Sequence, residues 1–456
     1  MARTPAVTGP RPVPELAEAP KRRRAAAITD VVLESGLRVI AVRKPGTPLV
    51  EVRLRIPFGR KSATANGTGP GVHSAKAELL SAGLLLGTAD RDREQVDAEL
   101  AMVGGHLDAG VDAQRLMVSG SVLSTGLKVL LDVLADTLTG AAYRTRDING
   151  ERDRLVEHLM ISGAQPSVIA HRHLQLHRFG NHPAAWDMPA AEDVAQVTAA
   201  AVRGLHRRSV VPAGSTLVLV GDLSPKAAVA AVAESLGDWT APGTAVALST
   251  PPSVQGAPLA AFDRPGAVQS QVRLTAAAVD RSHEGYAAQQ LANLIYGGYF
   301  SSRLVENIRE DKGYTYSARS GVEFWPGSAA LSVSFDTNTE STAPALWEAR
   351  YELGRLALVP PTEKEIESAR NYALGTLATS LSTQAGLAST LSGIAGADLE
   401  LGWIAEHPGR LAAVTSEQVH AMSRVIMAPT AFTGVVVGDL SAVGAQLASV
   451  GDVDLP

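Results

Sequence analysis

A gapless internal repeat constrains the fold of this chain more than any other feature. Residues 197–224 align with residues 414–441 at an offset of 217 residues, which Gly221 and Gly438 fix, and both copies end in Val-Gly-Asp-Leu-Ser. The other identical pairs include Val197/Val414, Thr198/Thr415, Val202/Val419, Arg207/Arg424, Pro212/Pro429 and Thr216/Thr433. A common strand-to-turn sequence would not keep this register through the preceding helical stretch. The repeat therefore indicates an ancient duplication.

The duplication predicts two similar domains, at residues 28–240 and 260–456. Residues 241–259 are rich in Pro, Gly and Ser and are expected to form a linker. Residues 1–27 are rich in Pro, Ala and charge but have no apolar core of the kind a signal peptide needs, so they are expected to be a disordered tail.

Each half combines strand and helix patterns. Apolar and polar residues alternate from Val50 to Ile56, which predicts a half-buried antiparallel strand, and Val39–Val42 is expected to pair with it. Leucines between 127 and 138 fall on one helical stripe, Leu331–Phe335 alternates again, and helices are expected near 340–356 and 362–384. Sheets covered by helices on one face follow from these patterns, which is an α+β architecture.

Composition excludes several functions. The net charge of −5 gives no broad positive field for nucleic acid or an anionic membrane, and no cysteine is present to form a disulfide or a thiolate metal site. No apolar run approaches the ~20 residues of a spanning helix. We expect a cytoplasmic protein with no nucleic-acid or membrane partner.

One motif in the first half suggests a damaged metal site. The run from Gly71 to Gly87-Thr88, followed by residues 99–109, resembles the first domain of M16 peptidases, a family that includes insulinase and the mitochondrial processing peptidases. There, His-x-x-Glu-His precedes a Gly-Thr. Two imidazoles at i and i+4 bind zinc from one helix face, and the Glu activates water. Matching Gly87-Thr88 to the family places Glu78 and Ala82 at the two His positions and Ser81 at the Glu position.

The third ligand of the family, a Glu, falls on His158 at the corresponding count. Because Ala cannot bind a metal and Ser is a poor general base, the resemblance implies that this chain has no metal or other cofactor of its own. An independent enzyme that uses Glu78 and His158 with an unusual metal is a less favoured alternative.

The second half keeps the family's C-terminal signature. The stretches from Asn293 to Leu304 and from Ile308 to Ser317 resemble it closely. Arg309 and Tyr316 match an Arg and a Tyr that grip the scissile peptide opposite the zinc, and the resemblance also implies substrate-binding positions at Gly297, Gly298, Arg303 and Tyr314. Without the resemblance, Arg309 would be interpreted as an ordinary residue of a helix end before Gly313.

The resemblance covers nearly the whole chain. It implies two tandem domains of the metallohydrolase fold shared by LuxS and the processing peptidases. It also implies a non-catalytic subunit that binds peptide substrates and supplies Arg309 and Tyr316 in trans to a partner chain carrying His-x-x-Glu-His and zinc. A structural or peptide-binding pseudopeptidase with no role in catalysis is the alternative.

Overall fold

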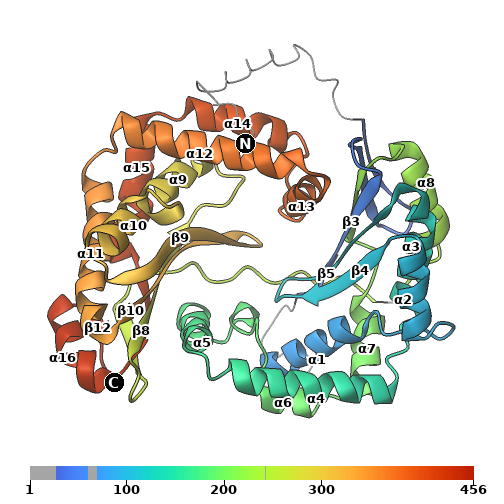
Figure 1. The fold of residues 1–456 in the computed structure, drawn as a ribbon, viewed down its shortest axis with the longest axis horizontal. Coiled ribbons are helices and arrows are strands. Elements are labelled where there is room, and N and C mark those ends of the chain that lie inside the picture. The colour runs from blue at the N-terminus through green and yellow to red at the C-terminus, as the bar shows by residue number, and fades with distance from the viewer. Residues whose placement is uncertain (1–26, 60–68, 242) are drawn as a thin grey trace, which may run out of the picture.

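The fold was determined from a computed structural model that describes residues 27–59, 69–241 and 243–456. The predicted disordered tail lies outside these ranges, except for residue 27. Two six-stranded sheets organise the chain, and each sheet is drawn from one half of the sequence (Figure 1). Within the described ranges no helix is long and apolar enough to cross a membrane.

The first sheet and its helices come from residues 28–236. The strands are β1 (Ile28–Val32), β2 (Arg38–Arg43), β3 (Leu49–Pro57), β4 (His106–Val111), β5 (Arg115–Leu123) and β6 (Thr216–Gly221). The helices are α1 (Pro70–Gly83), α2 (Arg93–Met102), α3 (Leu127–Gly140), α4 (Thr145–Ser162), α5 (Pro166–Phe179), α6 (Ala191–Ala195), α7 (Ala199–Ser209) and α8 (Pro225–Leu236).

The second sheet and its helices come from residues 259–454. The strands are β7 (Leu259–Asp263), β8 (Gln269–Ala278), β9 (Thr315–Trp325), β10 (Ser328–Asn338), β11 (Thr433–Gly438) and β12 (Val453–Asp454). The helices are α9 (Tyr286–Asn293), α10 (Arg303–Val305), α11 (Thr342–Leu358), α12 (Glu363–Ser382), α13 (Gln384–Ala395), α14 (Trp403–Ala413), α15 (Ser416–Ile426) and α16 (Leu440–Val450).

The sequence repeat is a structural repeat. Helices α7 and α15 both begin after a threonine, Thr198 or Thr415, whose side chain accepts a hydrogen bond from the backbone three residues later. Strands β6 and β11 follow them, and all six residues of each strand are buried. The strand orders β2-β6-β3-β5-β4 and β7-β11-β8-β10-β9 match. The duplication therefore extends to the topology of the sheets.

The α+β prediction is confirmed, but one expected strand pairing is wrong. Strand β2 does not pair with β3, because β6 lies between them, parallel to β2 and antiparallel to β3. The turn at Gly36 instead joins β2 to β1. Strand β6 arrives from more than 150 residues away in sequence, so a reading of neighbouring segments could not place it. Most other pairings in both sheets are antiparallel.

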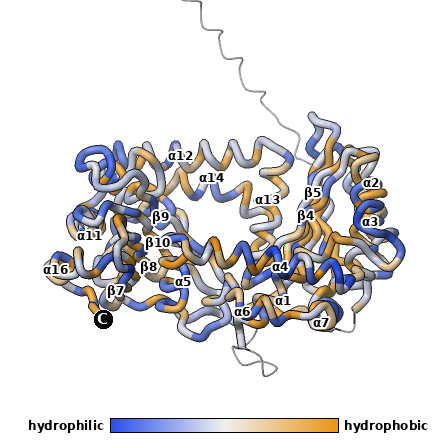
Figure 2. The backbone as a smooth tube through the Cα atoms, turned by 60° about the horizontal axis from the view of Figure 1, so that its bottom comes forward, coloured by the Kyte–Doolittle hydropathy of each residue, from blue (hydrophilic) through white to orange (hydrophobic). Residues whose placement is uncertain are grey.

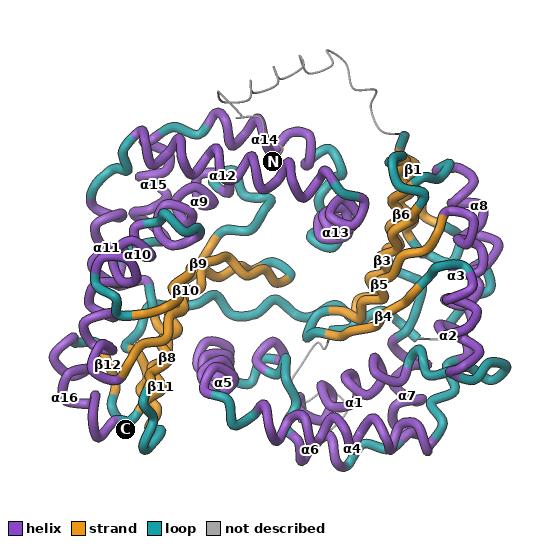
Figure 3. Tube along the Cα trace, in the orientation of Figure 1, coloured by secondary structure: helices purple, strands orange, loops and turns teal. Residues whose placement is uncertain are grey.

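Helices cover the outer face of each sheet, and the inner faces look toward each other (Figure 3). Hydrophobic residues gather where the helices meet the strands (Figure 2), and they form one large core in each half. The halves also exchange one helix each. Helix α13 packs on β6 and β3 of the first sheet, and α5 packs on β11 and β8 of the second. The exchange ties the two halves together through buried apolar surface.

Candidate functional site

Helix α1 carries three of the four positions that the resemblance assigns to the family's zinc site. Glu78 lines a small pocket of about 20 Å³ together with Asp112, Asp187 and neighbouring residues. Ser81 is buried, and its hydroxyl donates a hydrogen bond to the backbone oxygen of Glu78 at 3.0 Å. Ala82 is exposed. Of these three side chains, only Glu78 offers a metal-binding group to the pocket.

The pocket changes the acidity of Glu78. Burial raises the pKa of this carboxyl from 4.5 to about 7, and the negative charges of Asp112 and Asp187 add to the shift. The carboxyl is therefore partly protonated at neutral pH. A zinc ion at this place would be expected to hold the carboxyl ionised, since metal ligands must be deprotonated.

The fourth position, His158, is exposed on α4 and does not line the pocket. The described residues contain no group of three or more His, Asp or Glu side chains that could hold a metal ion. The residues at the family's ligand positions therefore do not fit a hydrolytic zinc ion, which needs three protein ligands and a base.

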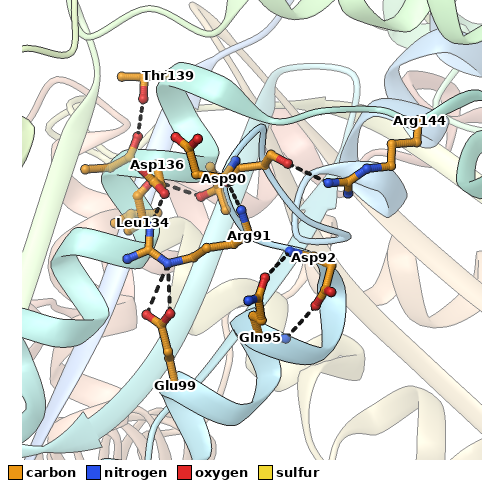
Figure 4. A network of polar contacts seen from close by, with 12 residues as sticks. Asp90, Arg91, Asp92, Gln95, Glu99, Leu134, Asp136, Thr139 and Arg144 are labelled. Carbon is orange, nitrogen blue, oxygen red and sulfur yellow. Dashed lines mark hydrogen bonds and ion pairs between the residues drawn. The ribbon is translucent and has the colours of Figure 1, made fainter.

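The Gly87-Thr88 turn, which sets the register of the motif, is fixed by polar contacts. Gly87 has φ of +118°, and the guanidinium of Arg144 donates a hydrogen bond to the backbone oxygen of Thr88. Nearby, Arg91 joins Glu99 of α2 to Asp136 of α3 (Figure 4). This turn after α1 is a structural landmark that does not depend on a metal.

Arg309 and Tyr316 are brought together in the second half. The guanidinium carbon of Arg309 lies 5.5 Å from the ring centre of Tyr316 and 4.8 Å from that of Phe300. Glu310 forms an ion pair with Arg309 at 3.4 Å. Tyr316 is 88% exposed and Phe300 is 61% exposed. Arg309, Tyr316 and Phe300 form a cation–aromatic cluster, called the Arg/Tyr cluster below, in which both rings are exposed and Arg309 is partly buried.

Arg309 and Tyr316 of the Arg/Tyr cluster lie in irregular backbone segments, a π-helical segment and a β-bulge. Arg309 lies in a π-helical segment, Glu306–Asp311, and a second one spans Leu294–Gly298. The pairing of β9 with β10 shifts by one residue between Ala318 and Thr315, so Tyr316 lies in a β-bulge. π-Helical turns and bulges recur next to functional sites, where they redirect side chains. Gly313 closes the helical segment with φ of +62°, as its helix-ending role predicted.

The other positions that the resemblance implied for substrate binding lie deeper. A Cβ atom on Gly297 would meet the Ser320 hydroxyl of β9 at 2.9 Å, so this glycine permits close packing of the π-helical segment on the strand. Arg303 is buried and forms two hydrogen bonds with Glu365, at 2.6 and 3.0 Å. These contacts indicate structural roles. The substrate-binding assignments remain predictions.

Gly298 ends the π-helical segment Leu294–Gly298, and Tyr314 directly precedes β9. A Cβ atom on Gly298 would lie 3.0 Å from the Asn293 side chain, and Tyr314 is partly buried against the second core. The sequence reasoning missed Phe300, although it belongs to the matched stretch, because nothing in the sequence marks which aromatic side chain stacks on Arg309. It also missed Asp112 and Asp187, which come from distant segments.

Two family models match consecutive parts of the chain. The model described as insulinase (peptidase family M16) matches residues 38–187, and the model described as peptidase M16 inactive domain matches residues 196–372. The chain belongs to peptidase family M16. The predicted family is thereby confirmed. The first match lies within the first half of the duplication, and the second begins at residue 196, late in the first half, and ends inside the second half.

Relatives of this M16 chain, and solved structures similar to it, are consistent with this family. An uncharacterized zinc protease of Mycobacterium tuberculosis is 25% identical over 91% of the chain and 92% of its own length. One of Bacillus subtilis is 22% identical over 76% of the chain and 83% of its own length. A structure titled peptidase M16 inactive domain, from Pseudomonas fluorescens, has a TM-score of 0.82 at 22% identity, covering 90% of this chain and 98% of its own. The last similarity shows the fold alone.

Proposed function

We propose that this M16 chain is the non-catalytic, substrate-binding subunit of a heterodimeric zinc metalloendopeptidase. One observation carries the proposal: Arg309 and Tyr316 lie together on the surface, whereas the positions of the zinc motif are Glu78, Ser81 and Ala82. The curated relatives are named as zinc proteases, so the loss of the ligands in this chain calls for a partner that has them.

The chemistry of the Arg/Tyr cluster suits a grip on a peptide carbonyl. A guanidinium is a permanent cation with several N–H donors, and a phenol is a further donor. Donors fixed at the place where a carbonyl oxygen gains negative charge stabilise the transition state more than the ground state. In the proposed complex, Arg309 and Tyr316 would donate to the scissile carbonyl while the partner's zinc activates the attacking water.

The exposure of the cluster supports action in trans. Tyr316 is 88% exposed, so bulk water competes with its hydroxyl for hydrogen bonds to a substrate carbonyl. Electrostatic stabilisation is much stronger where water is excluded. A partner chain seated over the cluster would exclude it. We propose that this partner is an M16 chain carrying His-x-x-Glu-His with bound zinc, that the substrates are unfolded peptides or precursor leaders, and that the complex works in the cytoplasm.

The proposal is tested by mixing the purified chain with an M16 chain of the same organism that carries His-x-x-Glu-His. Cleavage of an unstructured, internally quenched peptide should be faster in the mixture than with the zinc-binding chain alone. The increase should saturate at one equivalent. An unchanged rate at every ratio, with both chains folded, would refute the proposal.

A pseudopeptidase with no role in catalysis is the second candidate. The ion pair of Arg309 with Glu310 and its stacking on Phe300 favour it, because these are ordinary surface contacts that need no substrate. The candidates differ in what Arg309→Ala does to the complex. The substitution lowers turnover if the cluster grips substrate and leaves turnover unchanged if the chain only supports its partner.

A further inference from the structure

A cleft of about 870 Å³ lies between the two halves, away from the Arg/Tyr cluster. Strands of the first sheet line it together with residues of α13, such as Ser389 and Ser392. Arg38 of β2 and Arg55 of β3 both pair with Thr216 of β6, which lies between them. Arg115 on β5 lies diagonally next to Arg55, since the residue opposite Arg55 is Met117. The polar side of the strand alternation thus lines the cleft.

The lining of the cleft is richer in arginine than the chain as a whole. Among the described residues, five arginines and two aspartates, Asp280 and Asp398, line it, whereas the whole chain has a net charge of −5. A cleft lined by one sign of charge and walled by protein concentrates ligands of the opposite sign. Whether these arginines leave positive charge free for a ligand depends on which of them already have carboxylate partners.

Several of these arginines already have carboxylate partners. Arg38 forms an ion pair with Asp30 at 2.7 Å, and Arg115 forms one with Asp112 at 3.0 Å. Arg53 forms an ion pair with Glu51. Such pairing leaves little positive charge free for a ligand at these three positions.

Arg55 is different. Within the described chain it forms no ion pair, and its one hydrogen bond runs from Nη2 to the backbone oxygen of Gly396 at 3.3 Å. Burial lowers the pKa of Arg55 to about 10, and the neighbouring charge of Arg115 adds to this, while the negative charges of Asp112 and Asp398 oppose it. A guanidinium that is partly removed from water without a carboxylate in direct contact is costly, and a carboxylate ligand relieves that cost.

The second half supplies a further arginine, Arg281, to the lining of the cleft. The guanidinium carbon of Arg281 lies 3.9 Å from the ring centre of Phe324, and among the described residues Arg281 has no ion-pair partner. Phe324 and Trp325 also line the cleft at the end of β9. The amide of Gln114 donates a hydrogen bond to the backbone oxygen of Phe324 at 3.0 Å, which holds this wall against the first half. The site is therefore built from both halves.

We infer that this cleft binds a carboxylate of the peptide substrate, with Arg55 and Arg281 as its principal contacts. A planar guanidinium matches a carboxylate in bidentate geometry, and Phe324 holds the Arg281 plane by stacking. The carboxylate belongs to a Glu or Asp side chain or to the end of the peptide. The inference rests on the proposed peptide-binding function and adds a substrate class: peptides with an acidic segment beyond the cleavage site.

Calorimetric titration of the isolated full-length chain tests this directly. The ligands are a Glu-rich unstructured peptide with blocked ends, its Gln twin, and the Gln twin with a free C-terminal carboxylate. We expect one of the two carboxylate-bearing peptides to bind on the order of 10-fold more tightly than the blocked Gln twin, and its identity assigns the source of the carboxylate. Raising the salt concentration should reduce the difference. Equal affinity for all three peptides would overturn the inference.

Three variants locate the site. Arg55→Gln and Arg281→Gln should abolish the preference, as should Gly396→Ala, because a Cβ atom there would lie 2.4 Å from the Arg55 guanidinium and displace it without removing its charge. The control is Arg93→Gln, an exposed arginine on α2 that does not line the cleft, which should keep the preference. A preference that survives both Gln substitutions in folded protein would place the site elsewhere and contradict the assignment.

These titrations need neither partner nor zinc. If the cleavage mixture shows no gain but the acidic peptide still binds through Arg55, the proposed function fails and the cleft assignment stands. If the mixture cleaves and the acidic peptide binds no better than its twin, only the cleft assignment fails.

Discussion

At the scale of the residue, Glu78 shows how surroundings determine what a helix position can do. The resemblance implies that Glu78 places a carboxyl where the family has a histidine. The fold then buries it near Asp112 and Asp187, which raises its pKa to about 7. Because its pKa differs between the folded and unfolded states, the Glu78 carboxyl makes the stability of the protein depend on pH. It is also a poor substitute for an imidazole ligand.

The direction of that dependence follows from the shift. Because the folded pKa of about 7 exceeds the ordinary value of 4.5, the stabilising contribution is complete below about pH 4.5 and is lost as the pH rises through 7. Glu78→Gln should therefore be more stable than the wild type at pH 8, by at most about 3 kcal/mol, and equal to it near pH 4.5. Urea unfolding at both pH values measures this. Glu157→Gln, an exposed change on α4, serves as the control; an equal effect of both substitutions would contradict the account.

Arg303 allows a second prediction at this scale. Burial alone would raise the pKa of Glu365, but hydrogen bonds from Arg303 and Thr362 lower it to about 2. Arg303→Met should destabilise the protein by on the order of 2 kcal/mol at pH 7, since it leaves a half-buried carboxylate unpaired. The loss should shrink as the pH falls from about 4.5 toward 2, where Glu365 becomes neutral in both proteins.

Thermal unfolding of Arg303→Met against Arg319→Met, an exposed arginine on β9, tests the assignment. Unchanged stability of Arg303→Met would mean that the ion pair is not structural, and the substrate-binding prediction for Arg303 would regain support.

At the scale of the element, the sequence predicted what depends on short-range patterns. The alternation around Leu54 predicted β3, the leucine stripe predicted α3, and the repeat predicted matching helices before β6 and β11. The pairing of β2 was wrong because a strand from far along the chain inserts beside it. The bulge at Tyr316 and the two π-helical segments are set by tertiary packing, so no local pattern marks them.

The sequence did not predict that helix α13, from the second half, packs on the sheet of the first half. Its buried face joins Ala388, Leu391 and Ala395 to the apolar face of β2 and β6. Leu391→Ala should destabilise the protein by about 2–4 kcal/mol, as expected for a large-to-small change in a core. Leu358→Ala, at an 81% exposed position, should have little effect. Chemical denaturation measures both, and equal losses would show that α13 does not hold the first sheet.

At the scale of the whole molecule, the two halves have diverged in chemistry while keeping one topology. In the first half, the positions that the resemblance assigns to the zinc motif are Glu78, Ser81 and Ala82, and in the second half Arg309 and Tyr316 lie near each other. The degenerate zinc motif stays a prediction from the resemblance. The cleft between the halves could not be anticipated, because its residues come from strands, loops and α13, which lie far apart in the sequence and come together only in the folded chain.

The central claim is that Arg309 and Tyr316 act on a substrate held by a partner's zinc. Single-turnover cleavage of a quenched peptide by the reconstituted complex tests it most directly. We predict that Arg309→Ala and Tyr316→Phe each slow the chemical step by on the order of 100-fold. Arg319→Gln, on β9 with Tyr316, should leave it unchanged. Full cleavage rates with both variants, in complexes assembled as completely as the wild type, would contradict the claim.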